Sequence, residues 1–113
     1  MSAVAQMNMA ELQRRALRAS GLLKAMSNPV RLLVLCRLAE GEKSVGELER
    51  VVDVSQSALS QHLALLRSRG LVRFRRDGQT LYYSLAGLEA PALLAALYQI
   101  YCRKPTRRAL APA

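Results

Sequence analysis

A β-hairpin signal constrains the fold of this chain most, because it stands alone among segments with helical periodicity. Residues 71–85, LVRFRRDGQTLYYSL, are rich in β-branched and aromatic side chains and enclose Asp77-Gly78, which favours a two-residue type I′ turn. Counting outward from that turn predicts an apolar face and an arginine-bearing face, with the pairs Phe74–Leu81 and Val72–Tyr83 on one and Arg75–Thr80 and Arg73–Tyr82 on the other. The sequence therefore predicts one basic hairpin in a mainly helical protein.

Two helices are predicted in the first part of the chain. Apolar residues recur at three- and four-residue steps over residues 7–26, which is the stripe of an amphipathic helix that needs a partner surface. Asn28-Pro29 then favours the start of a second helix through RLLVLCRLA, and Gly41 favours its end. Because the apolar residues of this second helix lie nearly all round it, we expect it at the centre of the core.

Two further helices precede the hairpin. Ser44 with Glu47 three residues later is a capping-box pattern, and it predicts a short third helix, SVGELERVV, that ends near Asp53. Ser55 is the expected N-cap of a fourth helix, which Gly70 closes. The apolar residues of this fourth helix fall on one side and leave serine and glutamine on the other.

A fifth helix is predicted after the hairpin, over residues 88–102, and residues 103–113 are expected to form a disordered basic tail. The expected order is therefore α-α-α-α-β-β-α. No internal repeat or long linker divides the sequence, so all 113 residues are expected to form a single domain.

Residues 44–69 have the helix lengths and spacing of a helix-turn-helix, and the hairpin at residues 71–85 suits a wing. Together they predict a mainly α fold with a β-hairpin wing, a winged helix-turn-helix. Small donors and acceptors on the fourth helix suit base edges, and the arginines at its end and on the wing suit phosphates. The expected DNA-binding residues are Ser55, Gln56, Ser57, Ser60, Gln61, His62, Arg67, Arg75, Arg76 and Gln79.

The charge of the chain supports a polyanionic partner. Seventeen Lys and Arg against eight Asp and Glu give a net charge of +9, and residues 54–113 carry +7 of it. Without the four basic residues of the tail the net charge is still +5, so the tail alone does not explain the excess. Neutralising phosphates releases counterions and favours binding to nucleic acid.

The apolar content, 51%, suits a small globular core rather than a membrane span. Apolar runs such as residues 32–36 are far shorter than the roughly 18 residues that cross a bilayer. The N-terminal sequence has no basic leader followed by an apolar block, so we expect a cytoplasmic protein without a membrane partner. In that reducing compartment, two cysteines are not expected to form a lasting structural disulfide.

The chain resembles the ArsR-type winged-helix repressors, also called the ArsR/SmtB family. The resemblance covers roughly residues 16–101 and rests on LKAMSNPVRLLVLCRLAEGEKSVGELERVVDVSQSALSQHLALLRSRGLVRFRRDGQTLYYSL. It implies a homodimer through the first and last helices, at residues 7–26 and 88–102, and double-stranded operator DNA with inverted half-sites. No catalysis and no cofactor are expected.

Metal sites of the family are tested residue by residue. One subset carries two cysteines at the start of the third helix, but the corresponding run here is EKSVGEL, with Ser44 and Gly46 at those positions. Another subset carries His and acidic ligands on the last helix, where this chain has only Glu89. The single histidine, His62, lies in the fourth helix and suits packing or a phosphate contact, so no metal site is expected.

Cys36 and Cys102 lie 66 positions apart, in the second helix and at the end of the last. Their positions resemble a branch of the family that senses reactive sulfur species through a dithiol, including the biofilm growth-associated repressor, the sulfide-responsive repressors and HlyU-type regulators. This implies that a persulfide or polysulfide inducer links the two thiols by a disulfide or polysulfide bridge and releases the operator. Followed by Arg103 and Lys104, Cys102 is expected to be the exposed, attacking thiol, and Cys36 the more buried and less ionised one.

Two other interpretations stay open from the residues alone. A metal-responsive repressor could use the thiolates of a dimer as ligands. A thiol oxidoreductase is of a different class, but the chain has no C-x-x-C pair and no strand-helix-strand context for one. Free cysteine is also among the most buried residue types, so an inert pair is the structural alternative.

Overall fold

A computed structural model describes residues 6–102 of the chain. Its elements are α1 (Met9–Met26), α2 (Pro29–Leu38), β1 (Lys43–Ser44), α3 (Val45–Glu49), α4 (Gln56–Ser68), β2 (Val72–Asp77), β3 (Thr80–Leu85), α5 (Glu89–Leu97) and the π-helical turn η2 (Tyr98–Cys102). The expected tail at 103–113 lies outside the described residues.

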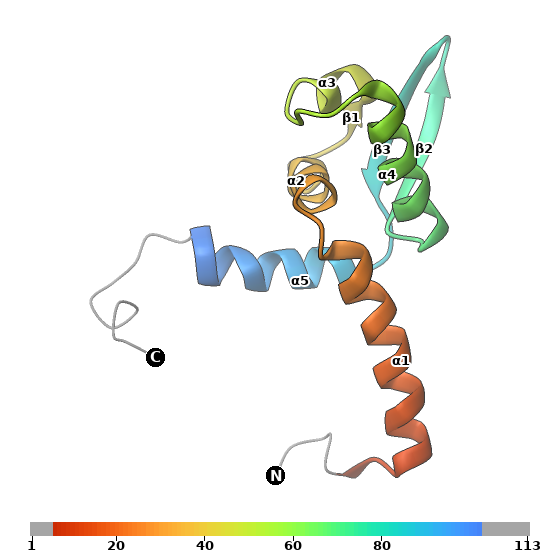
Figure 1. Ribbon diagram of the computed structural model, residues 1–113, viewed down its shortest axis with the longest axis vertical. Helices are drawn as coiled ribbons and strands as arrows, with labels where there is room; N and C mark the ends of the chain where they lie inside the picture. Colours follow the sequence, from red (N-terminus) through yellow and green to blue (C-terminus); the bar gives the residue numbers. More distant parts are fainter. Residues whose placement is uncertain (1–5, 103–113) are drawn as a thin grey trace, which may run out of the picture.

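The elements form a body from which two helices extend. Helices α2, α3 and α4 pack with the sheet in the body, whereas α1 and α5 leave it in different directions (Figure 1). The largest fully buried side chains come from three helices of the body and are Val34, Leu35, Leu48, Leu59 and Leu66. This core holds the helix-turn-helix and the hairpin as one unit and leaves much of the two terminal helices uncovered.

Helix starts follow the capping residues of the sequence. The Asn28 side chain accepts hydrogen bonds from the backbone N–H groups of residues 30 and 31, at 2.9 and 3.0 Å, with Pro29 in the first turn of α2. Ser44 and Glu47 form the reciprocal capping box of α3. The Ser55 hydroxyl accepts from the N–H of Ala58 at 3.1 Å, so the predicted N-cap of α4 is confirmed.

The hairpin register differs from the prediction by two residues. Asp77 pairs with Thr80, which makes Gly78-Gln79 the two-residue loop in place of Asp77-Gly78. Of the two loop residues, only Gly78 has a positive φ, of 64°. A two-residue turn that needs a positive φ at its first position favours glycine there. The hairpin still has one apolar face and one arginine-bearing face, because a shift of two residues leaves each side chain on the same face of the sheet. The observed pairs include Phe74 with Tyr83, Arg75 with Tyr82 and Arg73 with Ser84.

Three other expectations about the elements need correction. Strand β1 was not expected; it pairs antiparallel with β3 and gives the sheet order β1-β3-β2. Helix α3 ends at Glu49 rather than near Asp53, because hydrogen bonds to the third preceding carbonyl tighten residues 50 and 51 into a turn. The last helix is not continuous, since α5 gives way to a π-helical turn at Tyr98.

Helix α2 is buried on one side only, which also departs from the expectation of a helix surrounded by core. Val34, Leu35 and Leu38 are buried, but the side of α2 that bears Leu33 and Cys36 is exposed. A helix with apolar residues on every side can therefore still be exposed on one side in a single chain.

Candidate nucleic-acid interface

Helix α4 has the two-sided character that its sequence predicted. Leu59, Leu63 and Leu66 are buried against the body. The remaining polar positions in its first two turns, Gln56, Ser57, Ser60 and Gln61, are all exposed. Ser55 differs from them because its hydroxyl already accepts the capping hydrogen bond. The exposed side of α4 thus presents hydroxyls and amides that can donate and accept hydrogen bonds.

A cavity of about 560 Å³ joins part of this polar side to the wing. Its lining brings together four of the predicted contact residues, namely Gln56, Ser60, Arg67 and Gln79. The same lining contains Glu49 of α3, so its charge is mixed. Ser57 and Gln61 of the predicted set do not line it.

Arg67 connects the end of α4 to the wing. Its guanidinium lies over the Phe74 ring, 4.4 Å from the ring centroid, and Phe74 in turn packs at 5.6 Å from Tyr83. A cation over an aromatic face is attracted by the ring quadrupole. Arg67 therefore fixes the recognition helix against the hairpin while its side chain stays exposed.

Arg75 is exposed but forms an ion pair with Glu42, which the sequence did not predict. Its Nε and Nη2 donate to the two carboxylate oxygens of Glu42, at 2.9 and 2.7 Å, and its guanidinium lies 4.5 Å from the Tyr82 ring centroid. Hydrogen bonding from Arg75 is the main reason that the pKa of Glu42 lies below its ordinary value. Arg76 and Gln79, close to the hairpin turn, are exposed.

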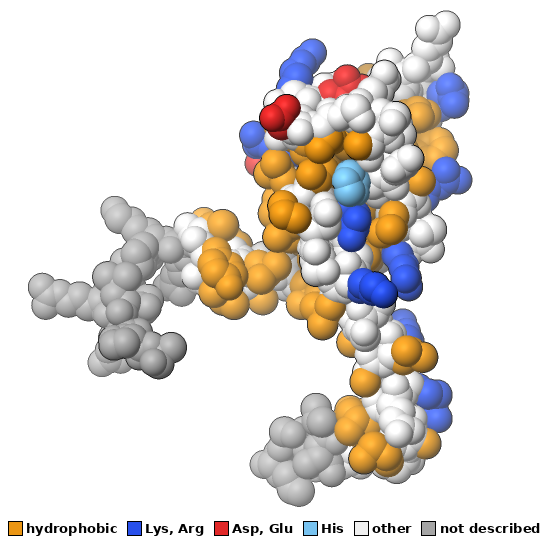
Figure 2. Space-filling view, viewed as in Figure 1, with side chains coloured by type: hydrophobic (Ala, Val, Ile, Leu, Met, Phe, Trp, Pro, Cys, Tyr) orange, Lys and Arg blue, Asp and Glu red, His pale blue; other side chains and the backbone are white. Residues whose placement is uncertain are grey.

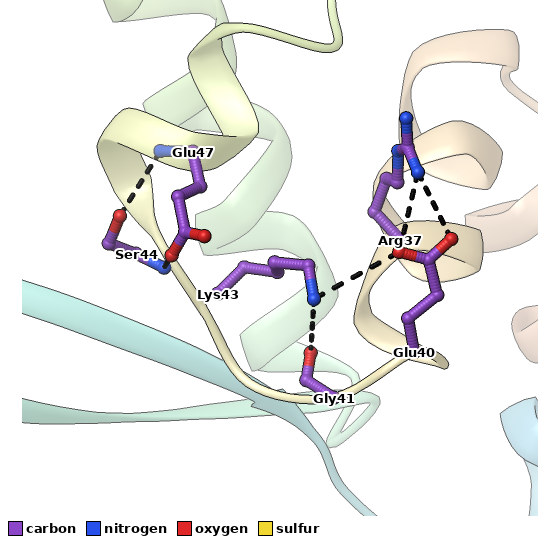
Figure 3. A network of polar contacts seen from close by, with 6 residues as sticks. All are labelled: Arg37, Glu40, Gly41, Lys43, Ser44 and Glu47. Carbon is purple, nitrogen blue, oxygen red and sulfur yellow. Dashed lines mark hydrogen bonds and ion pairs between the residues drawn. The ribbon is translucent and has the colours of Figure 1, made fainter.

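The loop before α3 is fixed by a polar network (Figure 3). Arg37 donates to the Glu40 carboxylate at 3.0 Å, and Lys43 Nζ donates to the Gly41 carbonyl at 3.5 Å and lies 4.0 Å from Glu40. The capping box of α3 begins at the next residue, Ser44. These exposed pairs each contribute little to stability, and the start of α3 is set by the capping box.

His62 lies apart from the exposed polar residues of α4. Its ring is half-buried, and its Nδ1 lies 3.3 Å from Arg31 Nη1 of α2. This contact fits the packing role that was one of the two expectations for this histidine. The contact of His62 with Arg31 could not be predicted from the sequence, because it depends on how α1, α2 and α4 pack together.

Both thiols are exposed. Cys36 was expected to be the more buried and less ionised of the two thiols; its side chain is exposed, but its environment disfavours the thiolate. Partial desolvation raises the pKa of Cys36 above its ordinary value of 9.0, and negative charge on Cys102 and on Glu40 raises it further. Within residues 6–102, no three side chains of His, Cys, Asp or Glu are grouped as a metal would require.

Residues 28–73 match the family described as bacterial regulatory protein, arsR family. The transcriptional activator HlyU of Vibrio cholerae is 48% identical over 88% of this chain and 92% of its own length. The chain belongs to the ArsR family. A second member, the biofilm growth-associated repressor of Xylella fastidiosa, is 43% identical over 88% of this chain and 87% of its own. The family includes both activators and repressors at this similarity.

Solved structures of ArsR-type regulators agree with the fold. Reduced HlyU from Vibrio cholerae superposes with a TM-score of 0.80 and 46% identity, over 84% of this chain and all of that one. A homodimeric winged helix-turn-helix DNA-binding domain from Mycobacterium bovis superposes with a TM-score of 0.70 and 28% identity, over 88% of this chain and 89% of its own. The winged helix-turn-helix prediction is confirmed.

The chain is accordingly a DNA-binding transcriptional regulator, and its relatives and structural neighbours are regulators rather than enzymes. None of the helices between residues 6 and 102 is long and apolar enough to cross a membrane.

Proposed function

We propose that this ArsR-family regulator is a homodimeric repressor whose reduced form binds an inverted-repeat operator. Reactive sulfur species link Cys36 to Cys102, and the linked dimer leaves the operator, which turns on genes of the sulfide-detoxification type. The observation that supports the proposal is that both thiols are free and exposed to a reagent. Charge on Cys102 is also one of the causes, after desolvation, that raise the pKa of Cys36, although 66 positions separate the two residues.

Dimerisation is supported by the apolar side chains on the terminal helices. Leu17 of α1 is 76% exposed, and Ile100 and Tyr101 of η2 are 67% and 79% exposed. Hydrophobic side chains are prominent on both extended arms in Figure 2. A twofold-related copy would cover such surfaces with the same surfaces of its own. The neighbour from Mycobacterium bovis is a homodimer, which agrees with this assembly.

Operator reading is assigned to α4 and the wing. Gln56, Ser57, Ser60 and Gln61 would meet base edges in the major groove, where amide and hydroxyl groups discriminate bases. Arg67 and Arg76 would contact phosphates. Two recognition helices of a dimer then fix half-sites about 34 to 36 Å apart, or a multiple of this spacing.

The cross-link needs no oxidant beyond the inducer. The Cys102 thiolate attacks the outer, sulfane sulfur of a persulfide RSSH, and the S–S bond breaks to leave a persulfide on Cys102 and release RSH. The Cys36 thiolate then attacks the Cys102 sulfur, forms the disulfide and expels hydrogen sulfide. Two thiols are oxidised and one persulfide is reduced; a longer polysulfide donor leaves extra sulfur in the bridge.

Operator binding by fluorescence anisotropy at fixed salt tests the proposal. The protein is assayed reduced, after glutathione persulfide and after zinc, with intact mass measured alongside. We expect persulfide to weaken binding roughly 5- to 150-fold together with the mass change of an intramolecular bridge, and to do neither in Cys36→Ser or Cys102→Ser. Binding that resists persulfide but is weakened by zinc would overturn the dithiol switch in favour of a thiolate metal sensor.

A further inference from the structure

Arg31 lies where three helices meet. Its Nε donates to the Ala25 carbonyl at 2.6 Å and its Nη2 to the Lys24 carbonyl at 3.3 Å, both in the last turn of α1. Its Nη1 lies 3.3 Å from His62 Nδ1 on α4. Figure 2 shows this single histidine, in pale blue, directly beside a basic side chain on the body. One α2 side chain thus contacts the end of α1 and the middle of the recognition helix.

The direction of these hydrogen bonds follows from chemistry. A guanidinium only donates, so His62 Nδ1 must accept, with any ring proton on Nε2. The last carbonyls of a helix lack intrahelical partners and carry partial negative charge, which suits a cation. Arginine satisfies both helices at once because its donors are arranged in a fixed planar fork, whereas lysine offers one point charge.

The same two helices also approach each other closely at a second place. Arg69, which follows α4, places Nη1 3.0 Å from where a side chain on Gly21 of α1 would begin. Glycine inside an 18-residue helix costs about 1 kcal/mol relative to alanine, and its lack of a side chain leaves room for this arginine. Arg31 of α2 therefore bridges α1 and the middle of α4, and Arg69 lies close to α1 at the end of α4.

We propose that Arg31 is a positioning residue for operator recognition, which holds α4 at a set orientation to α1 through His62 and the α1 carbonyls. In the dimer that the proposed function requires, α1 belongs to the shared interface, so Arg31 relates the reading helix to the twofold axis. Cys36 follows Arg31 on the same helix by about 7.5 Å of rise.

Charge-preserving substitution separates positioning from a phosphate contact. Reduced Arg31→Lys, Arg31→Gln and wild type are titrated with operator and with a scrambled duplex over a salt series, and Arg37→Lys on the same helix is the matched control. We expect both Arg31 variants to lose at least ~5-fold in the ratio of operator to scrambled affinity, with an unchanged salt slope. Arg37→Lys keeps the wild-type ratio.

His62 supplies an independent variant that leaves the α1 carbonyl contacts intact. His62→Phe removes the acceptor and is expected to lower the same ratio, whereas His62→Gln, which retains an acceptor, restores most of it. In Arg31→Lys/His62→Phe the losses should not add, because both remove one link. Thermal unfolding of every variant verifies that the proteins are folded at the assay temperature.

Two outcomes overturn the inference. An unchanged ratio in folded Arg31→Lys and His62→Phe means that the link does not position α4. A salt slope reduced by about one in Arg31→Gln, with Arg31→Lys close to wild type, means that Arg31 binds a phosphate directly. Both measurements use reduced protein, so their results do not depend on whether persulfide releases the operator. Failure of the dithiol switch would be seen only in the persulfide-treated wild type.

Discussion

Single residues in this protein take roles that their neighbours in space decide. Arg75 and Arg76 are adjacent arginines on the same strand, and both suit phosphates by sequence. Only Arg75 meets Glu42 and the Tyr82 ring, so its charge is already partnered before DNA arrives. If Arg75 bound a phosphate instead, its ion pair with Glu42 would be lost, whereas Arg76 forms no ion pair within the described residues.

The Cys36 thiol gives a pH prediction at this scale. Because its pKa is raised above 9.0, the thiol form is favoured, and the reactive thiolate accumulates only as pH rises past that value. We expect iodoacetamide alkylation of Cys36, followed by mass spectrometry of its peptide, to have a midpoint at higher pH than the same peptide in the unfolded chain. In Cys102→Ser the midpoint should fall but stay raised, because desolvation remains the larger cause. A folded-state midpoint equal to or below that of the unfolded chain would contradict the raised pKa.

At the scale of elements, the local sequence predicted where helices begin better than where they end. The caps at Ser44 and Ser55 are satisfied as predicted, because each hydrogen bond lies within three residues. Asn28, which was predicted only to mark the start of α2 together with Pro29, is its N-cap. The end of α3 and the π-helical turn after α5 had no such local signal. Residues 50 and 51 form a turn through hydrogen bonds to the third preceding carbonyl, and residues 98–102 continue the chain after α5 as a π-helical turn.

Ser55 and Ser57 form a matched pair for testing the recognition helix. Ser55→Ala removes the hydroxyl that accepts from Ala58 N–H and should lower the free energy of unfolding by about 1 kcal/mol. Ser57→Ala, at an exposed site, should leave stability within about 0.5 kcal/mol and weaken operator binding instead. Urea denaturation and anisotropy separate the two effects. Equal losses of stability in both variants would contradict the assignment of the cap.

For the whole molecule, one chain alone leaves its terminal helices half covered. The body has a continuous core from α2 to β3, but the exposed Leu17, Ile100 and Tyr101 have no cover within the described residues. Burying large apolar side chains contributes roughly 1.5–3 kcal/mol each. In the proposed homodimer, a second copy of the chain buries these side chains.

Leu17→Glu tests that assembly. Twofold symmetry places the carboxylate in the interface twice, so the dimer dissociation constant should rise at least ~10-fold. Sedimentation velocity over a concentration series measures it, with Leu65→Gln as the control, since Leu65 is 38% exposed on α4. A mutant dimer as tight as wild type would move the interface away from this face of α1.

The sequence by itself determined the winged helix-turn-helix, the caps, the two faces of α4 and of the hairpin, and the excess of positive charge. These depend on periodicity, capping and composition, which act over a few residues. Only the tertiary structure decided the two-residue shift in the hairpin register, the exposure of Cys36 and its electrostatic link to Cys102. It alone also brought Glu42 to Arg75, and Arg31 to His62 and the end of α1. Those contacts join residues that are distant in sequence, and their partners follow from packing that no local pattern encodes.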